Sequence, residues 1–402
     1  MKEEAMFVKK SLAALLAGVA VLGAVSGAVA AEKVLKIGVL GVMSGSAASW
    51  GLVNRYCAEA SAEMINEAGG FEIGGEKYKI KIVSVDDRND PKVAISGAER
   101  LIYEEKIHYI IGPNIAPTSM AIVPVLEKGG AISIPYAFPK ALYTPPASNS
   151  ILGMIASYQA GPVIFKYLMK EHGIKTIAFV ARNDTESLTM REESLQSAKE
   201  LGLEVLSDKD TYETGTTDFF PVMTSIVAKN PDLLVLSGPA PADTPLLIKT
   251  ARELGYQGFM CAENAQDAKV ISELAGDAAN GFISVGGAST PEIRSDYMNE
   301  FIKRYEKIAG EWNDEAGTKV YALDYILNTI KAAGPEAIND VEKFKAAMNT
   351  FSIPNPYIKG DAAPLHYIGE KYFQQKRQFS VPMVIVTYEG GEFKTLFVGS
   401  AE

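Results

Sequence analysis

The stretch that decides the fold is Lys36–Gly51, KIGVLGVMSGSAASWG. Its first half has the apolar pattern of a β-strand, and its second half is a loop of small residues that ends on the single aromatic Trp50. Small hydroxyl residues offer adaptable hydrogen bonds, and an indole offers a flat apolar wall. At the carboxyl end of a first parallel strand, such a loop is typical of one side of a ligand cleft.

Strand and helix patterns alternate along the rest of the chain. Residues 78–85 alternate apolar and polar side chains as a strand does, and Asp90-Pro91 has the cap and first-turn pattern of a helix. The alternation restarts at Tyr158 and continues to Val285. It predicts parallel sheets with right-handed crossovers, and two runs of similar size predict two similar α/β lobes. Near the end, Gly390-Gly391 predicts a hairpin between two strands.

Residues 1–30 have the pattern of a secretory signal peptide. Lys9 and Lys10 precede an apolar run from Leu12 to Val25, and Ala28-Val29-Ala30 supplies small residues for cleavage. The apolar run is too short and too rich in Ala and Gly for a good membrane span. Because no Cys lies at the predicted cut, we expect an exported mature protein without a lipid anchor.

Composition and charge exclude several classes of protein. The chain has 402 residues, which exceeds one ordinary core and favours two domains. The formal net charge is −10 without a long basic run, which argues against a nucleic acid partner. The glycines at 38, 41 and 45 do not have the spacing of a dinucleotide loop, and the histidines are scattered. We therefore expect no enzyme, no cofactor and no metal site, and we expect Cys57 and Cys261 to be buried thiols.

The chain resembles a known family, the periplasmic solute-binding proteins of bacterial ABC importers, specifically the branched-chain amino acid type. The matching segments cover essentially the whole mature chain, and they are Lys36–Gly51, Ile65–Gly70 (INEAGG), Asp86–Pro91 (DDRNDP), Tyr109–Gly112 (YIIG), Gly130–Pro135, Gln159–Leu168, Ala251–Gly255 (ARELG) and Ile271–Phe282 (ISELAGDAANGF).

The resemblance implies the type I periplasmic binding protein fold: α/β, with two doubly wound parallel-sheet lobes joined by a three-strand hinge. The implied N-terminal lobe is 32–154 with 286–375, and the implied C-terminal lobe is 155–285 with 376–402. A small-molecule ligand would bind between the lobes and close the hinge. The resemblance also implies a monomeric periplasmic protein whose partners are the membrane subunits of an ABC permease.

Ten candidate ligand contacts follow from the resemblance: Trp50, Asn114, Ala116, Ala137, Phe138, Tyr158, Arg182, Glu186, Ala240 and Glu263. Trp50 matches an aromatic wall, and Glu263 matches a Glu that pairs with a ligand ammonium. The chain departs from the family where Ala116 replaces a usual Ser, Pro139 a usual Thr and Ala240 an aromatic residue. A ligand carboxylate would thereby lose two strong partners, each worth roughly 1–3 kcal/mol.

These departures leave the ligand and the role open between alternatives. The lost hydroxyls, together with Trp50, Tyr136, Phe138 and Tyr158, favour an aromatic or apolar organic acid. Glu263 favours an aliphatic amino acid or an amide instead. A sensory binding protein that reports to a receptor is a further alternative on the same fold, because transport and sensing need the same cleft.

Overall fold

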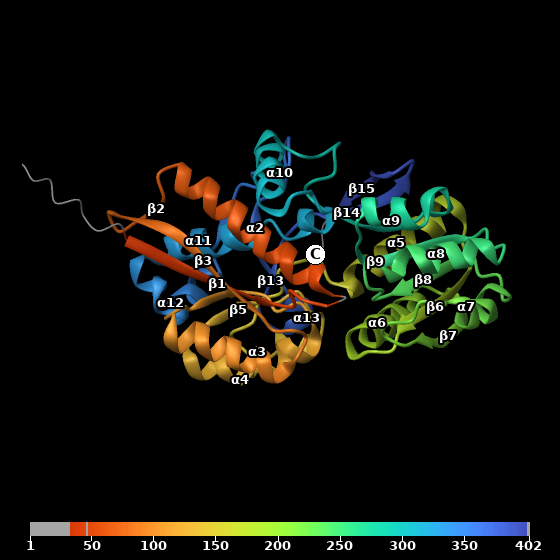
Figure 1. The fold of residues 1–402 in the computed structure, drawn as a ribbon, viewed down its shortest axis with the longest axis horizontal. Helices are drawn as coiled ribbons and strands as arrows, with labels where there is room; N and C mark the ends of the chain where they lie inside the picture. The colour runs from red at the N-terminus through yellow and green to blue at the C-terminus, as the bar shows by residue number, and fades with distance from the viewer. Residues whose placement is uncertain (1–32, 46, 400–402) are drawn as a thin grey trace, which may run out of the picture.

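The structure is a computed structural model that describes residues 33–45 and 47–399. It contains two α/β lobes that lie side by side, with the first lobe in red, orange and blue and the second mainly in green (Figure 1). The predicted signal peptide at 1–30 lies outside the described residues. Among the described helices, none combines the length and apolar character needed to cross a bilayer.

The first lobe is built on a five-stranded sheet of order β2-β3-β1-β4-β5. All pairs are parallel except the edge strand β2, which runs antiparallel to β3. One face is covered by α3 and α4, which pack beside each other below the sheet in Figure 1, and α2 lies on the opposite face. The bounds are β1 Lys33–Gly41, α2 Ala48–Glu67, β2 Phe71–Ile73, β3 Glu76–Asp86, α3 Pro91–Glu99, β4 Tyr109–Ile111, α4 Ala116–Gly129 and β5 Ile132–Ile134.

The second lobe is built on a seven-stranded sheet of order β15-β14-β10-β9-β8-β6-β7. The strands from β10 to β7 are parallel, whereas β14 and β15 add an antiparallel hairpin at one edge. The bounds are α5 Ser157–His172, β6 Thr176–Arg182, α6 Thr185–Glu200, β7 Glu204–Tyr212, α7 Phe220–Val227, β8 Leu233–Ser237, α8 Asp243–Glu253, β9 Phe259–Ala265, α9 Ala268–Leu274, β10 Ile283–Gly286, β14 Met383–Glu389 and β15 Glu392–Gly399.

The central strands of the second sheet, such as β6 and β8, are buried on both faces. Ile177 and Phe179 of β6 belong to the core shared with α5 and α6, while Ala178 and Val180 belong to a second core under α7, α8 and α9. This alternation explains why the strand reads as one continuous apolar run, as parallel strands covered by helices on both sides do.

The segments between β10 and β14 return to the first lobe, where α10 packs on α2. They include a small sheet of order β11-β12-β13. Their bounds are α10 Asp296–Ala309, a 3₁₀ helix Asp314–Thr318, α11 Ala322–Ala333, α12 Val341–Ala347, β11 Ser352–Ile353, β12 Leu365–Ile368, α13 Glu370–Phe373 and β13 Gln378–Phe379.

The chain passes between the two large sheets after β5, after β10 and after β13. Two of these passages touch, because Leu152 and Gln378 form a parallel bridge. The lobe boundaries at 154, 285 and 375 stay predictions at the level of single residues.

The structure confirms the α/β fold class with parallel sheets, and several local predictions with it. Asp90 caps α3 by accepting the N–H groups of Lys92 and Val93, with Pro91 at the first helical position. Cys57 and Cys261 are buried free thiols.

The sequence pattern also predicts helices over 291–308 and 316–333 and a strand over 258–261, and the structure differs from each of these boundaries. The helix expected from Pro291 begins at Asp296, because Ser295 caps it through the Met298 N–H. The helix expected over 316–333 is interrupted between the 3₁₀ helix and α11. The strand expected to end at Cys261 continues to Ala265, because it pairs with β8 and β10.

Candidate ligand-binding site

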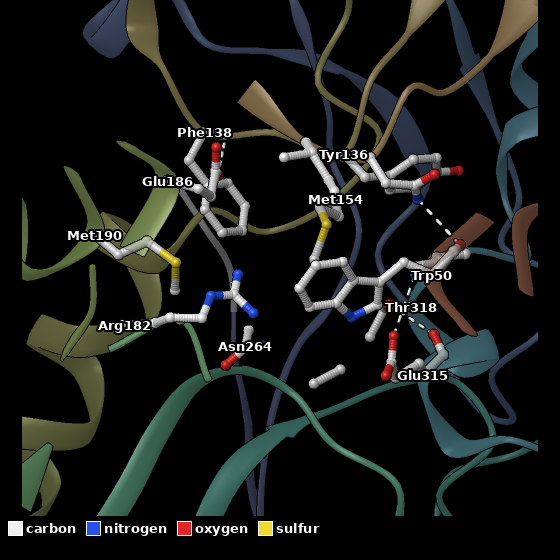
Figure 2. A pocket seen from close by; sticks show the side chains of 15 residues that line it. Trp50, Tyr136, Phe138, Met154, Arg182, Glu186, Met190, Asn264, Glu315 and Thr318 are labelled. Carbon is white, nitrogen blue, oxygen red and sulfur yellow. Dashed lines mark hydrogen bonds and ion pairs between the residues drawn. The ribbon is translucent and has the colours of Figure 1, made fainter. Parts of the chain in front are cut away.

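A cavity lies between the lobes at the carboxyl ends of the strands. Its walls border about 590 Å³ of space, a figure that includes the part open to solvent. Residues that follow β1, β4, β5, β6, β8 and β9 converge there, as expected at the strand ends of α/β sheets. The lining residues are Trp50, Asn114, Ile115, Tyr136, Phe138, Met154, Arg182, Glu186, Met190, Gly238, Asn264, Ala265, Glu315, Thr318 and Lys319 (Figure 2).

The largest part of the wall is aromatic and apolar. Trp50 lies in the first turn of α2, and its indole points into the cavity with the Met154 side chain beside it (Figure 2). Tyr136 and Phe138 come from the loop after β5 and are both buried. A flat ring or a branched aliphatic group would find contacts on several sides of this wall.

Arg182 is the cation of the second lobe in this cavity. It ends β6 and is 8% exposed, and its guanidinium carbon lies 5.6 Å from the centroid of the Trp50 ring. Its Nε donates to the Asp184 carboxylate, which also caps α6 through the Ser187 N–H. Within the described residues the guanidinium makes no other hydrogen bond. Its terminal nitrogens can therefore bind a ligand carboxylate.

A buried ion pair lies on the first-lobe side. Lys319 Nζ is 3.3 Å from Glu315 Oε2, and both side chains are 5% exposed or less. Lys319 also lies 5.7 Å from the centroid of the Tyr136 ring. Burial raises the pKa of Glu315, and Lys319 opposes that shift. The charge of Lys319 is thus already partly balanced within the protein.

Glu186 crosses from the second lobe to the first. It lies in the first turn of α6, and its Oε1 accepts the Phe138 N–H at 2.8 Å. Burial of the carboxyl raises its pKa to about 8, although the amides of Phe138 and Ala116 favour the ionised form.

Several polar atoms around the cavity are buried and have no hydrogen-bond partner within the described residues: Asn114 Oδ1, Tyr136 OH, Glu186 Oε2, Asn264 Oδ1 and Glu315 Oε1. An unmade hydrogen bond of a buried group costs about 1–3 kcal/mol. Their gathering around one cavity is what a site for a partly polar ligand requires.

Contacts between the lobes flank the cavity. Lys140 Nζ of the first lobe lies 2.8 Å from Glu193 Oε2 of α6. At another point Asp267 accepts the Asp314 N–H at 3.0 Å, and Asp314 accepts the Ala268 N–H at 3.1 Å. Burial, followed by the charge of Asp267, raises the pKa of Asp314 to about 6. These contacts join the two lobes on either side of the cavity.

The structure brings five of the ten predicted contacts to this cavity, namely Trp50, Asn114, Phe138, Arg182 and Glu186. Ala116, Ala137, Tyr158, Ala240 and Glu263 do not line it. Ala116 and Ala137 are fully enclosed within the first lobe, and the Tyr158 ring packs 5.2 Å from that of Tyr372. Ala240 lies beyond Gly238, which forms the wall there. Ligand contact itself stays a prediction for every one of them.

Glu263 is placed away from the cavity by the pleat of β9. Its neighbours Asn264 and Ala265 line the cavity, whereas Glu263 is 1% exposed and accepts the Ser194 hydroxyl under α5 and α6. Burial raises its pKa to about 8. At this part of the wall the side chain that faces the cavity is the amide of Asn264.

Sequence reasoning missed Asn264, the two methionines and the Glu315–Lys319 pair. Glu315 and Lys319 are four residues apart, and the sequence predicts a helix that begins between them, over 316–333. Their spacing is that of an ordinary surface ion pair, so only their burial marks them. Met154 and Met190 carry no signal beyond ordinary core character.

Comparisons with known proteins agree with this geometry. A family model described as periplasmic binding protein matches residues 34–392. An amino acid binding protein from Pseudomonas aeruginosa is 30% identical over 241 residues, which is 60% of this chain and 62% of that relative. The chain therefore matches less than two thirds of the length of that relative.

Solved structures share the fold at low identity. The substrate-binding protein of a branched-chain amino acid transporter from Streptococcus pneumoniae, in complex with isoleucine, has a TM-score of 0.75 at 20% identity, covering 92% of this chain and 99% of that one. An ABC transporter solute-binding protein from Rhodopseudomonas palustris, in complex with benzoate, has a TM-score of 0.73 at 20% identity, covering 92% and 96%.

Proposed function

This chain belongs to the periplasmic binding protein family, and we propose that it captures a small organic solute between its lobes and delivers it to the membrane subunits of an ABC permease. The observation that carries the proposal is the cavity at the strand ends, whose walls come from both lobes. A ligand that contacts both lobes binds the closed form better than the open one, so its binding energy favours closure.

We propose an aromatic or apolar organic acid as the ligand. Trp50, Tyr136 and Phe138 offer flat apolar surface to a ring, and the terminal nitrogens of Arg182 offer a charge-assisted, two-pronged contact to a carboxylate. The loops that would hold the carboxylate of an α-amino acid carry Ala116 and Pro139, neither of which has a side-chain hydroxyl. The related fold that holds benzoate is consistent with such a ligand.

An aliphatic amino acid or an amide is the second candidate. Asn264 Oδ1 and Glu315 Oε1 are buried acceptors without a partner in the described residues, and an ammonium or amide N–H would satisfy them. A sensory protein on the same fold is a further candidate, because a receptor can recognise the same closed shape.

The remaining parts of the proposal concern partners and location. We propose that the protein is exported to the periplasm by its N-terminal signal and acts as a monomer without a nucleic acid partner. The chemistry of the cavity supports binding, and no enzymatic step is proposed for it.

The test is native mass spectrometry of the purified protein, followed by a thermal-shift series with benzoate, 3,4-dihydroxybenzoate, benzamide and L-isoleucine. A ligand at a hundred times its Kd stabilises the folded state by about 2.7 kcal/mol. Stabilisation by the two benzoates with none by isoleucine is expected. Stabilisation by isoleucine alone would overturn the aromatic acid in favour of the amino acid, and loss of uptake on deletion of the gene separates transport from sensing.

A further inference from the structure

The contact between Glu186 and Phe138 occupies a hydrogen-bond donor of the ligand cavity. Glu186 Oε1 accepts the Phe138 N–H at 2.8 Å, and both residues line the cavity. Figure 2 shows the carboxylate against Phe138, on the far side of the cavity from Glu315. The donor belongs to the first lobe and the carboxylate to the second. A carboxylate of the protein therefore occupies the place that a ligand carboxylate could take at the Phe138 N–H.

The carboxylate is held there by a well-fixed helix start. Asp184 caps α6 through the Ser187 N–H at 2.9 Å. The Ser187 hydroxyl donates to the Gly238 carbonyl at 2.9 Å, which ties the first turn of α6 to the end of β8. Glu186 lies between these two anchor residues. The helix start that carries Glu186 is thus fixed from both sides.

A ligand carboxylate cannot share this donor with Glu186. One N–H makes one good hydrogen bond, and two carboxylates in contact in a buried site repel each other or must share a proton. Oε1 accepts the N–H whether Glu186 is ionised or protonated, so the donor is taken in both states.

The cation that is left for an acidic ligand group is Arg182. Its guanidinium points into the cavity from the second lobe, whereas Lys319 is paired with Glu315 on the other side. The acidic group of a ligand is therefore assigned to the second-lobe side of the cavity, at Arg182, with the Trp50 ring beside it.

We propose that Glu186 is a specificity-determining residue: it fills the anion position at the Phe138 amide, directs the single carboxylate of the ligand to Arg182, and rejects ligands that carry a second carboxylate. The inference rests on the proposed function, because it concerns the orientation of the ligand in the same cavity. The ligand class it names is a monocarboxylic acid.

Two pairs of acids test this inference by titration calorimetry: benzoate against terephthalate, and L-isoleucine against L-glutamate. Wild type is expected to bind the monoacid of one pair at least tenfold more tightly than the diacid. Glu186→Ala frees the Phe138 amide and vacates the space of one carboxylate, so the affinity for the matching diacid is expected to rise at least tenfold. Unchanged diacid affinity in a variant that still binds the monoacid would overturn the inference.

Two further variants separate occupancy from charge. Glu186→Gln keeps an oxygen on the Phe138 N–H, so it is expected to keep the preference for the monoacid. Glu192→Ala removes the same charge from an exposed position of the same helix, and it is expected to leave the preference unchanged. A gain of diacid binding in Glu192→Ala would mean that net charge, and not the filled donor, sets the preference.

A ligand-free measurement keeps the inference separate from the identity of the ligand. The amide resonance of Phe138, observed in protein labelled with ¹⁵N-phenylalanine and assigned with Phe138→Leu, is expected to shift in Glu186→Ala and not in Glu192→Ala. An unmoved resonance would show that Glu186 does not occupy the donor. If no acid of either pair binds to wild type while the resonance does shift, the proposed ligand class fails and the filled donor stands.

Discussion

The guanidinium of Arg182 lies 5.6 Å from the centroid of the Trp50 ring, and the two residues come from different lobes. Trp50 lies in the first turn of α2 next to the first sheet, and Arg182 ends β6 in the second. A cation over an indole face contributes about 0.5–2 kcal/mol, so this pair favours the closed form. It also places the apolar wall beside the charge that we assign to the ligand carboxylate.

Substitution of Arg182 tests that assignment. Arg182→Gln is expected to weaken benzoate binding about tenfold or more, because a hydrogen bond to a charged group is worth about 1.5–3 kcal/mol. Arg182→Lys keeps the charge but loses the planar fork, so an intermediate loss is expected. Calorimetry with benzoate measures both. Arg191→Gln on α6, outside the cavity, serves as the control, and equal affinity of Arg182→Gln and wild type would contradict the assignment.

Burial of Glu263 predicts a pH dependence of stability. Its pKa is about 8 in the folded protein against about 4.5 otherwise, so the folded state holds the proton more tightly. The stabilisation is fully present below about pH 4.5 and is lost as the pH rises through 8. Urea unfolding measures the free energy of unfolding at pH 5 and at pH 9. Between these two pH values wild type is expected to lose more of this free energy than Glu263→Gln, by an amount on the order of a few kcal/mol. If the two proteins lose the same free energy of unfolding between pH 5 and pH 9, the prediction is contradicted. Glu192→Gln, at an exposed position, is the control.

Gly161 on α5 is required by the same carboxylate. A Cβ at this position would clash with Glu263 Oε1 and lie 3.1 Å from Ser194 Oγ. Gly161→Ala is therefore expected to lower the free energy of unfolding, although Gly to Ala within a helix ordinarily gains about 1 kcal/mol. Denaturant unfolding of the double variant Gly161→Ala/Glu263→Ala is the control. If removal of Glu263 does not reduce the cost of the alanine, the clash is not its cause.

The buried pair of Glu315 and Lys319 is expected to respond differently to one change and to two. Glu315→Gln leaves the Lys319 charge buried without its partner, at an expected cost of about 3–5 kcal/mol. Replacing both residues by Met removes both charges and is expected to cost less. Denaturant unfolding of the ligand-free proteins measures the difference. If the double Met variant loses as much free energy of unfolding as Glu315→Met and Lys319→Met lose together, the coupling is ruled out.

The sequence predicted the architecture because its periodicities are local. The apolar run of β6, the cap at Asp90 and the Gly390-Gly391 turn each determine their own neighbourhood. The order of such segments then predicted two similar lobes with a cleft. Trp50 could be placed in that cleft because it ends the loop that follows the first strand.

The rest of the site could not be predicted, because it depends on which face of a strand or helix each single side chain points to. A shift of one residue along a strand exchanges the two faces, and this separates Glu263, which is enclosed under α5, from Asn264 at the cavity wall. Glu315 and Lys319 look like an exposed pair in the sequence, yet the fold encloses them.

By itself, the sequence determined the fold class, the family and the presence of a cleft lined by Trp50, because repeated strand and helix patterns persist over hundreds of residues. The tertiary structure alone decided which charges face the cleft. Contacts such as Glu186 with Phe138 join residues that are far apart in the chain and belong to different lobes, and only the packing of one lobe against the other brings such groups within hydrogen-bond distance.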